Sequence, residues 1–349
     1  QWHLARAASG NPVSQNIVGL AYRDGLDVPV DLNKAGDFLD KAATAGLPEA
    51  QYHLGELFAK GLTRQHRPAL EFRWKERAAR QGHLQAMHDV AQLYFSGFKL
   101  AVTDPQDTEW VRQTGLGTAA GEPAGMEWLT KAAEGGHARA SLDLGRRLLA
   151  KSAAGKDPAA TAQAQRWLTK AAEQGETLGQ FTLGIALRDG HGQKPDRAEA
   201  IRWLGLAAAK GQTEAEFALA MLLLESATGT EAAKGAGWLR QAAEQGFAKA
   251  QVNLGMDLLS EQKPGQQIDD LSVSKSATQA VGWFRKAAEQ GNSLGQGMLG
   301  TCYLKGWGVP KDSLQGVSWL RKGAEQGDPE AQRNLGTCYY LGEGVAKDE

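Results

Sequence analysis

The 349-residue chain carries 39 Lys and Arg against 40 Asp and Glu, a net charge of −1 at pH 7, and shows no run of like charge. This balance removes the main electrostatic argument for a nucleic-acid partner or an anionic membrane, since both are held by clustered basic side chains. No apolar stretch approaches the roughly 18–20 residues of a membrane-spanning helix, so we expect no direct membrane insertion.

An aromatic residue recurs along the chain, and a glycine follows it eight positions later each time. The nine aromatic residues are Trp2, Phe38, Trp74, Trp128, Trp167, Trp203, Trp238, Trp283 and Trp319. Their separations are 36, 36, 54, 39, 36, 35, 45 and 36 residues. A period of about 20 to 50 residues is typical of a solenoid of stacked units. We therefore predict one all-α domain over residues 1–349, an α/α solenoid of about nine helix–turn–helix repeats.

Each repeat begins with a first helix whose apolar residues recur at spacings of three and four, the pattern of one helical face. In all nine copies a small residue follows the Leu position: Gly19, Gly55, Ala91, Gly145, Gly184, Ala220, Gly255, Gly300 and Gly336. Glycine inside a helix costs about 0.5–1 kcal/mol relative to alanine. The seven glycines therefore predict that another helix approaches closely at this point.

A second helix carries the recurring aromatic residue, which we expect in the core. A small residue stands three positions before it in most copies, and Glu71 breaks this rule. The helix closes with Lys-Ala-Ala-Glu-Gln-Gly at 170–175 and 286–291. The final glycine predicts a left-handed residue just beyond the helix C-terminus.

These features resemble the Sel1-like repeat family, a relative of the tetratricopeptide arrays, over nearly the whole chain. The clearest matches are residues 283–291, residues 299–303 and the loop 306–312. Glutamines stand where the tetratricopeptide motif places its first-helix tryptophan: Gln51, Gln180, Gln251, Gln296 and Gln332. The resemblance implies a right-handed superhelix in which the first helix of each repeat lines the concave face.

On such a first helix, the exposed positions lie two residues before and two after the Leu position, and together they form one ridge. We predict that a partner binds this ridge at Tyr52, His88, Arg146, Phe181, Ile185, Phe217, Met221, Val252 and Met256. The ridge is apolar in its centre and polar at its ends, as exposed protein-binding patches often are. Two alternatives stay open: a tightly wound superhelix buries these positions as core, or a partner binds the edges or the convex face.

Two loops between first and second helices, near 97–123 and 260–276, are longer than the period requires. Both interrupt the same type of connection, so we expect them on the same edge of the solenoid. Long loops in compact arrays are often functional. Trp110 and Trp307 are the tryptophans outside the repeat position. We place Trp110 in the predicted partner-binding site, the alternative being that it packs the loop onto its own scaffold.

The chain starts inside a second helix at Trp2, and residues 342–349 match the loop 306–312 that leads into another helix. We therefore expect a natural protein that is longer at both ends. The last first helix, with Leu335 and Tyr339, lacks a following partner. This predicts either end-to-end self-association or a missing downstream element.

Catalytic and metal-binding motifs are not evident. The seven histidines are dispersed and lack metal-ligand spacing, and neither a phosphate-binding loop nor a nucleophile elbow occurs. We expect no enzyme, no cofactor and no metal. Cys302 and Cys338 lie 36 residues apart at equivalent positions. Because equivalent helices lie about 8–10 Å apart, we expect two buried free cysteines, with a disulfide as the alternative.

Our first functional hypothesis is a non-enzymatic interaction scaffold or adaptor that binds a protein or peptide on its concave face and long loops. The resemblance also permits an immunity-type inhibitor, because similar Sel1-like proteins neutralise co-encoded secreted toxins, some of them phospholipases. An envelope or exopolysaccharide assembly scaffold is a further alternative. The resemblance favours the bacterial periplasm or cell envelope.

Overall fold

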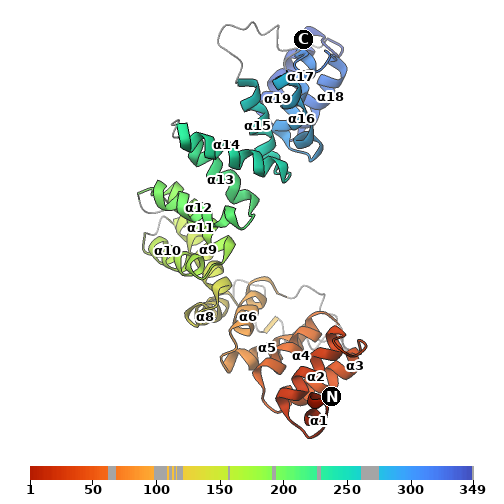
Figure 1. Cartoon of the computed structure of the whole chain (residues 1–349), viewed down its shortest axis with the longest axis vertical. Coiled ribbons are helices and arrows are strands. Elements are labelled where there is room, and N and C mark those ends of the chain that lie inside the picture. The colour runs from red at the N-terminus through yellow and green to blue at the C-terminus, as the bar shows by residue number, and fades with distance from the viewer. Residues whose placement is uncertain are drawn as a thin grey trace. The chain divides into compact units, whose positions relative to one another are not determined.

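The computed structural model describes residues 1–61, 68–97, 108–109, 112–113, 115, 121–155, 158–190, 194–225, 229–260 and 275–347. Over these residues the chain is all-α, with no strand (Figure 1). The helices are α1 (Trp2–Ala8), α2 (Pro12–Asp24), α3 (Leu32–Thr44), α4 (Pro48–Ala59), α5 (Pro68–Arg80), α6 (Leu84–Ser96), α8 (Glu122–Glu134), α9 (Ala138–Gly155), α10 (Pro158–Glu173), α11 (Thr177–Asp189), α12 (Arg197–Ala209), α13 (Thr213–Leu224), α14 (Gly229–Glu244), α15 (Ala248–Ser260), α16 (Lys275–Glu289), α17 (Ser293–Lys305), α18 (Ser313–Glu325) and α19 (Pro329–Leu341). The predicted all-α solenoid of helix pairs is confirmed.

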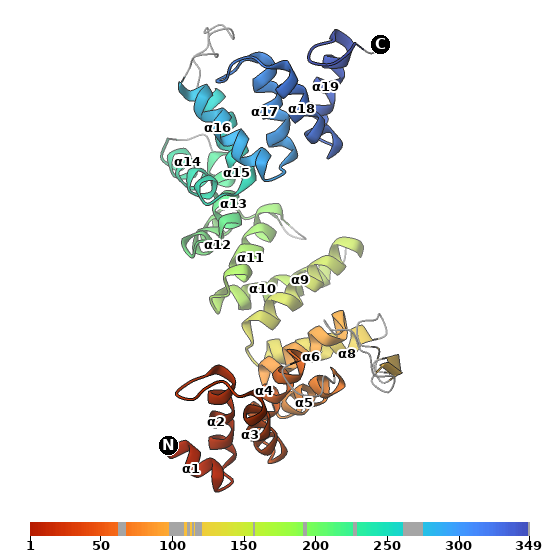
Figure 2. The same cartoon turned by 90° about the vertical axis from the view of Figure 1, so that its right-hand side faces the viewer.

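The chain forms two compact units, the described residues up to Leu183 (unit 1) and those from Gly184 onward (unit 2). Successive helices pack against each other from α1 to α10 in unit 1 and from α12 to α19 in unit 2 (Figures 1 and 2). The first helices of the repeats are α2, α4, α6, α9, α11, α13, α15, α17 and α19, and the others are second helices. Most of the long loop near 97–123, and residues 261–274 of the other, lie outside the described residues, and the single array over 1–349 stays a prediction.

Side chains define the beginnings of several of these helices, and glycines define the ends of the second helices. Asp312 accepts a hydrogen bond from the Gln315 amide at 3.0 Å, and Asn292 accepts one from the Gly295 amide at 2.8 Å. Such caps satisfy amides that lack a partner inside the helix. The glycine eight residues after each aromatic has a positive φ in all nine copies, for example 96° at Gly46. The predicted left-handed residue is thus confirmed.

In seven of the nine second helices, the residue after the aromatic is an apolar core residue, and the aromatic itself in most copies lies at the rim. The fully or nearly fully buried residues at this position are Leu39, Leu129, Leu168, Leu204, Leu239, Phe284 and Leu320. Among the tryptophans of the repeat position, Trp203 is buried, Trp2 is exposed and the others are half-buried. A basic side chain three residues later covers the ring in several copies, as Lys322 does at 4.0 Å from the Trp319 ring centre. The expected core position is thus met fully at Trp203 and in part at the half-buried tryptophans, which pack against the core clusters from the rim, because the inserted face of the helix lies one residue further on.

The glycines of the first helices receive these core side chains. A Cβ atom at Gly255 would lie 2.6 Å from the Phe284 ring, and one at Gly184 would lie 2.7 Å from Leu204 Cγ. Real Cβ atoms do not approach so closely, so the predicted close approach of another helix is confirmed. Gly336 is different, since a Cβ there would meet nothing within 4 Å.

Two recurring glutamines link one repeat to the next. Gln51 Nε2 donates to the Ala43 carbonyl at 3.1 Å, and Gln81 Nε2 donates to Gln51 Oε1 at 2.8 Å. The same donation to an alanine carbonyl eight residues earlier recurs at Gln15, Gln180, Gln251, Gln296 and Gln332. The first-helix glutamine therefore ties its amide to the end of the preceding second helix. In each of these copies except the exposed Gln332 this amide is buried, and an unpaired polar group there would be costly.

Cys302 and Cys338 are both free and buried, which confirms the expected pair of unbridged cysteines. Burial raises the pKa of the Cys302 thiol to about 12. Among the described helices, none combines the length and the apolar character needed to cross a bilayer. Tyr340 and Leu341 of α19 are exposed, and the expected end-to-end self-association stays a prediction.

Candidate functional site

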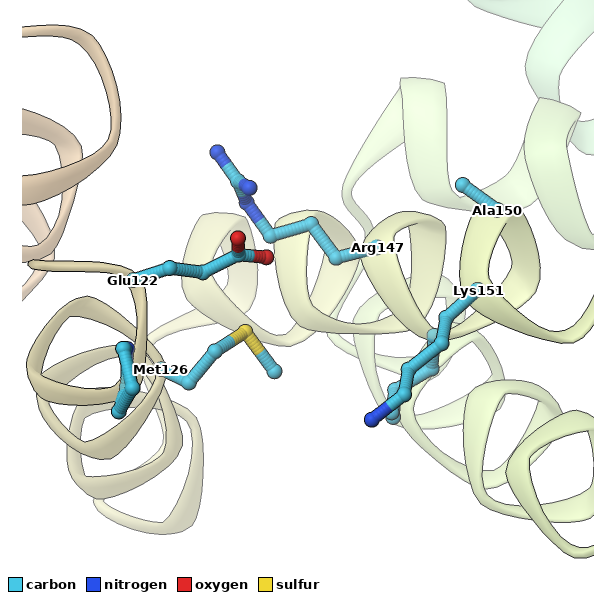
Figure 3. Close-up of a pocket in the computed structure, with 7 residues that line it drawn as sticks. Glu122, Met126, Arg147, Ala150 and Lys151 are labelled. Atoms are coloured by element: carbon cyan, nitrogen blue, oxygen red, sulfur yellow. The ribbon is translucent and has the colours of Figure 1, made fainter. Parts of the chain in front are cut away.

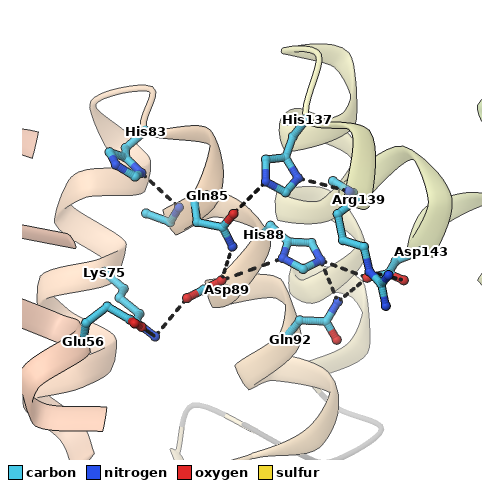
Figure 4. A network of polar contacts seen from close by, with 12 residues as sticks. Glu56, Lys75, His83, Gln85, His88, Asp89, Gln92, His137, Arg139 and Asp143 are labelled. Carbon is cyan, nitrogen blue, oxygen red and sulfur yellow. Dashed lines mark hydrogen bonds and ion pairs between the residues drawn. The ribbon is translucent and has the colours of Figure 1, made fainter. Parts of the chain in front are cut away.

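A continuous chain of polar side chains runs across the first helices of unit 1 (Figure 4). It begins at Glu56 on α4, passes through Lys75 on α5 and Asp89 on α6, and reaches Asp143 on α9. Arg139 then links Asp143 of α9, at 3.7 Å, to the residue just before α11. Three successive first helices and the residue that precedes a fourth are thus connected by charged or hydrogen-bonding groups.

Lys75 lies at the centre of this row of polar side chains. It is 4% exposed and occupies the core position that holds Leu or Phe in most other second helices. Its Nζ atom lies 3.0 Å from carboxylate oxygens of Glu56, Glu71 and Asp89. Burial opposes the charge, but Asp89 and the two glutamates outweigh it, so the pKa of Lys75 is raised. A buried charge is tolerated only with such partners.

His88 continues the chain from α6 to α9. Its Nε2 atom lies 2.8 Å from Asp143 Oδ2, and its Nδ1 atom lies 3.7 Å from Asp89 Oδ1. Burial acts against the imidazolium, but the hydrogen bond to Asp143 and the nearby Asp89 carboxylate outweigh it and raise the pKa of His88. The Asp89 carboxyl is buried too, yet His88 and Lys75 lower its pKa to about 2. This part of the chain is therefore held by opposite charges.

Two further histidines begin the helices on either side of this contact. His83 Nδ1 accepts the Ala86 amide at 3.1 Å, and His137 Nδ1 accepts the Ala140 amide at the same distance. In the sequence these histidines stand in separate repeats, and their convergence was not predicted. The available signal was their equivalent place, directly before two first helices, where three other repeats carry the capping residues Asn11, Asn292 and Asp328.

A cavity of about 700 Å³ lies between α8 and α9 of unit 1 (Figure 3). Its lining residues are Glu122, Pro123, Met126, Arg147, Leu148, Ala150 and Lys151. Glu122 and Met126 extend from α8 toward α9. The lining mixes one acidic, two basic and several apolar groups, so no single ligand chemistry is favoured.

The predicted ridge differs between the two units in polarity and burial. In unit 1, Tyr52 is half-buried and stacks on His83 with ring centres 4.6 Å apart, and Arg146 is exposed. In unit 2, Ile185, Phe217, Met221 and Met256 are half-buried on α11, α13 and α15. Phe181, also half-buried, lies one turn before Ile185 on α11.

The expected exposure is wrong at two ridge positions. Val252 is 1% exposed, because it packs in a core cluster with Phe284, Leu299 and Cys302 of the following helices. His88 is buried against α9, where its ring stacks on His137 with centres 5.1 Å apart. The alternative of a buried ridge therefore holds at these two residues.

Of the two tryptophans outside the repeat position, the structure describes Trp307 and not Trp110. Trp110 lies outside the described residues, and its role in binding stays a prediction. Trp307 is half-buried and packs against the core cluster around Phe284. Packing onto its own scaffold, the alternative to an interface role, therefore describes Trp307.

The polar side chains of this site in unit 1 form ion pairs and helix caps. Within the described parts of the chain, no group of three or more His, Cys, Asp or Glu side chains is arranged to hold a metal ion. The Lys75 ammonium occupies the space between the three carboxylates around it. These carboxylates therefore act as partners of a lysine.

The Sel1 repeat model matches nine segments of this chain: residues 12–47, 48–83, 111–137, 138–176, 177–212, 213–247, 248–292, 293–328 and 329–349. No curated protein matches the chain.

Solved structures give the same fold. A protective antigen present in uropathogenic Escherichia coli strains, displaying an SLR fold, is 29% identical with a TM-score of 0.60, over 99% of this chain and 76% of that one. A Sel1 repeat protein from Oxalobacter formigenes is 28% identical with a TM-score of 0.65, over 97% of this chain and 89% of that one. An immunity protein from Pseudomonas aeruginosa is 17% identical with a TM-score of 0.32, over 82% and 84%, too distant to indicate a shared function.

Proposed function

This chain belongs to the Sel1 repeat family, and we propose that it is a scaffold that holds a protein or peptide partner on the first helices of unit 2. Sel1 repeat proteins are non-enzymatic protein-interaction scaffolds. Membership of the family thus indicates the general role, and the proposed binding surface is argued from the residues of this chain.

The observation that carries the choice of surface is a set of half-buried apolar side chains on successive first helices. Ile185, Phe217, Met221 and Met256 are half-buried and lie two residues before or after the Leu position on α11, α13 and α15, so part of each side chain is accessible. We call these four residues the apolar ridge. Each can lose water on contact with a partner, which is worth about 25 cal/mol per Å² of apolar surface.

The packing beneath the ridge supports a role as a rigid platform. Phe217 packs against a core cluster of α13 to α15, and its ring centre lies 5.3 Å from that of Phe247. Met256 packs against the next cluster, around Phe284. Anchored aromatic residues with adaptable methionines beside them suit a peptide or helix of apolar character.

Affinity capture from the source organism's lysate, quantified by mass spectrometry, tests this proposal. The arms are the unchanged chain, Phe217→Asp, and Leu314→Asp, which places the same charge on a side chain that is 74% exposed away from the ridge. Circular dichroism melting of each variant separates lost binding from lost folding, and Met221→Lys serves if Phe217→Asp unfolds.

The proposal predicts a partner that is lost with Phe217→Asp and retained with Leu314→Asp. Retention by both folded variants contradicts it. The identity of the partner then separates the finer functions: a secreted toxic enzyme indicates an immunity-type inhibitor, and envelope or exopolysaccharide components indicate an assembly scaffold.

A further inference from the structure

Two neighbouring first helices of unit 1 are each preceded by a histidine whose Nδ1 atom must be unprotonated. His83 Nδ1 accepts the Ala86 amide, and His137 Nδ1 accepts the Ala140 amide. A ring nitrogen that accepts a hydrogen bond cannot also carry a proton. Protonation of either ring at Nδ1 therefore removes the cap of α6 or α9, whereas Asn and Asp caps elsewhere in the chain make no such demand.

His137 is fixed at its other nitrogen as well. Its Nε2 atom lies 2.9 Å from Gln85 Oε1, and the Gln85 amide donates to Asp89 Oδ1 at 2.7 Å. With Nδ1 accepting, Nε2–H is the donor to Gln85. Both nitrogens of the neutral ring are thus in use, and this tautomer joins α9 to α6.

The neighbouring ring of His88, by contrast, is stabilised in its protonated form. His88 lies between the carboxylates of Asp143 and Asp89 and stacks on His137 with an interplanar angle of 25°. An imidazolium at His88 is stabilised by these carboxylates. A second proton on His137 would place two cations face to face with their ring centres 5.1 Å apart.

The charged and titratable groups around the three rings come from every helix packed here: Glu49, Tyr52, His53 and Glu56 of α4, Glu71 and Lys75 of α5, Asp89 of α6, Arg139, Asp143 and Arg146 of α9, and Glu176 before α11. Lys75 already pairs with Asp89, and Arg139 already contacts Asp143. On the adjoining α8, Lys131 pairs with Glu127, and Lys170 of α10 donates to the Ala133 carbonyl. No carboxylate in this set therefore stands free beside the His137 ring to receive a new cation.

We propose that the contact between α6 and α9 is an acid-sensitive joint, closed while His88 is protonated and His83 and His137 are neutral, and opened when these two histidines gain protons. The joint goes beyond partner binding, because it makes the stacking of two repeats respond to mild acid whether or not a ligand is present.

The direction of the pH effect follows from the protonation states. Burial lowers the pKa of His83 and of His137, so both contribute stability above about pH 6.5, and this stability is lost as the pH falls below that value. His88 acts in the opposite sense, because its pKa is raised, and it contributes stability at low pH. Mild acid therefore weakens the two histidine caps and the stacked contact, while the pairing of His88 with Asp143 persists.

Native-state hydrogen exchange at single amides tests the joint. The Ala86 and Ala140 amides, capped by histidine, are compared with the Gly295 and Ala331 amides, capped by Asn292 and Asp328, at pH 7.5 and pH 5. Protection factors, which remove the intrinsic effect of pH on exchange, are expected to fall about fivefold or more at the histidine-capped amides and to stay nearly constant at the other two. An equal change at all four amides overturns the proposal.

A cap that does not titrate provides the matched variant. His137→Asn keeps a side-chain acceptor for the Ala140 amide, so the pH response at Ala140 is expected to vanish while that at Ala86 persists. A pH response at Ala140 that is unchanged in His137→Asn also contradicts the proposal. The measurement on the unchanged chain decides the question if this variant does not fold.

Discussion

Lys75 Nζ lies 3.0 Å from Glu71 Oε1 on α5, at two positions one helical turn apart that hold an apolar and a small residue in most other second helices. The two exceptions occur together and neutralise each other inside the stacked repeats. Their pairing is thus a local replacement of a hydrophobic contact by an ionic one.

Lys75→Leu should therefore destabilise the protein, although it restores the residue type found at this position in other repeats. It leaves Glu71 buried without its cation, and breaking a buried pair from one side costs about 3–5 kcal/mol. The double variant Glu71→Ala with Lys75→Leu should recover part of this loss, because both positions then match Ala35 and Leu39 of the preceding second helix, whereas Glu56 and Asp89 still lack the lysine. Urea unfolding of both variants checks this, and equal losses in the two would show that the pair is not coupled.

Gly300→Ala and Gly336→Ala should change stability in opposite directions. A Cβ at Gly300 would lie 2.8 Å from the Gly316 carbonyl oxygen and from Leu320 Cγ, so crowding should cost about 1–3 kcal/mol. At Gly336 nothing lies within 4 Å, and alanine should stabilise α19 by about 0.5–1 kcal/mol. Thermal unfolding measures both, and the account fails if the two substitutions have the same sign.

Glu216→Gln should stabilise unit 2. Glu216 is 0% exposed and occupies the position of the linking glutamines, where it accepts from Gln241 at 2.7 Å and from Gln245 at 2.9 Å. Glutamine could instead donate to the alanine carbonyl eight residues earlier, as Gln251 does, and would remove a buried charge. We expect about 1 kcal/mol at neutral pH from denaturant unfolding. The converse change, Gln251→Glu, should destabilise, and a stable Gln251→Glu variant would argue against the role given to the linking glutamines.

Asp89 should make unit 1 lose stability in strong acid. Its pKa is about 2, below the usual 3.8, because His88 and Lys75 outweigh the effect of burial. Its contribution is present above pH 3.8 and is lost as the pH falls toward 2, by about 2 kcal/mol. In Asp89→Asn the free energy of unfolding should vary less between pH 4 and pH 2 than in the unchanged chain. Identical pH profiles would show that Asp89 does not carry this dependence.

The repeat architecture could be predicted because it depends on local rules. The glycine at position 46 ends a helix whatever surrounds it, and the glycine at 255 indicates a close neighbour by its cost alone. The burial of His88 and Val252 could not be predicted in this way, because it depends on how tightly successive repeats wind. Lys75 is a further case: a lone lysine in a helix suggests an exposed face until carboxylates from three helices are seen around it.

The most direct test of the proposed function is the affinity of the captured partner for a set of alanine variants of the chain. Phe217→Ala and Met256→Ala should each raise the Kd by about tenfold or more, as expected for central contacts, while Leu314→Ala should leave it unchanged. A Kd that is unaffected by both ridge variants, in proteins with unchanged melting curves, would contradict binding at the apolar ridge.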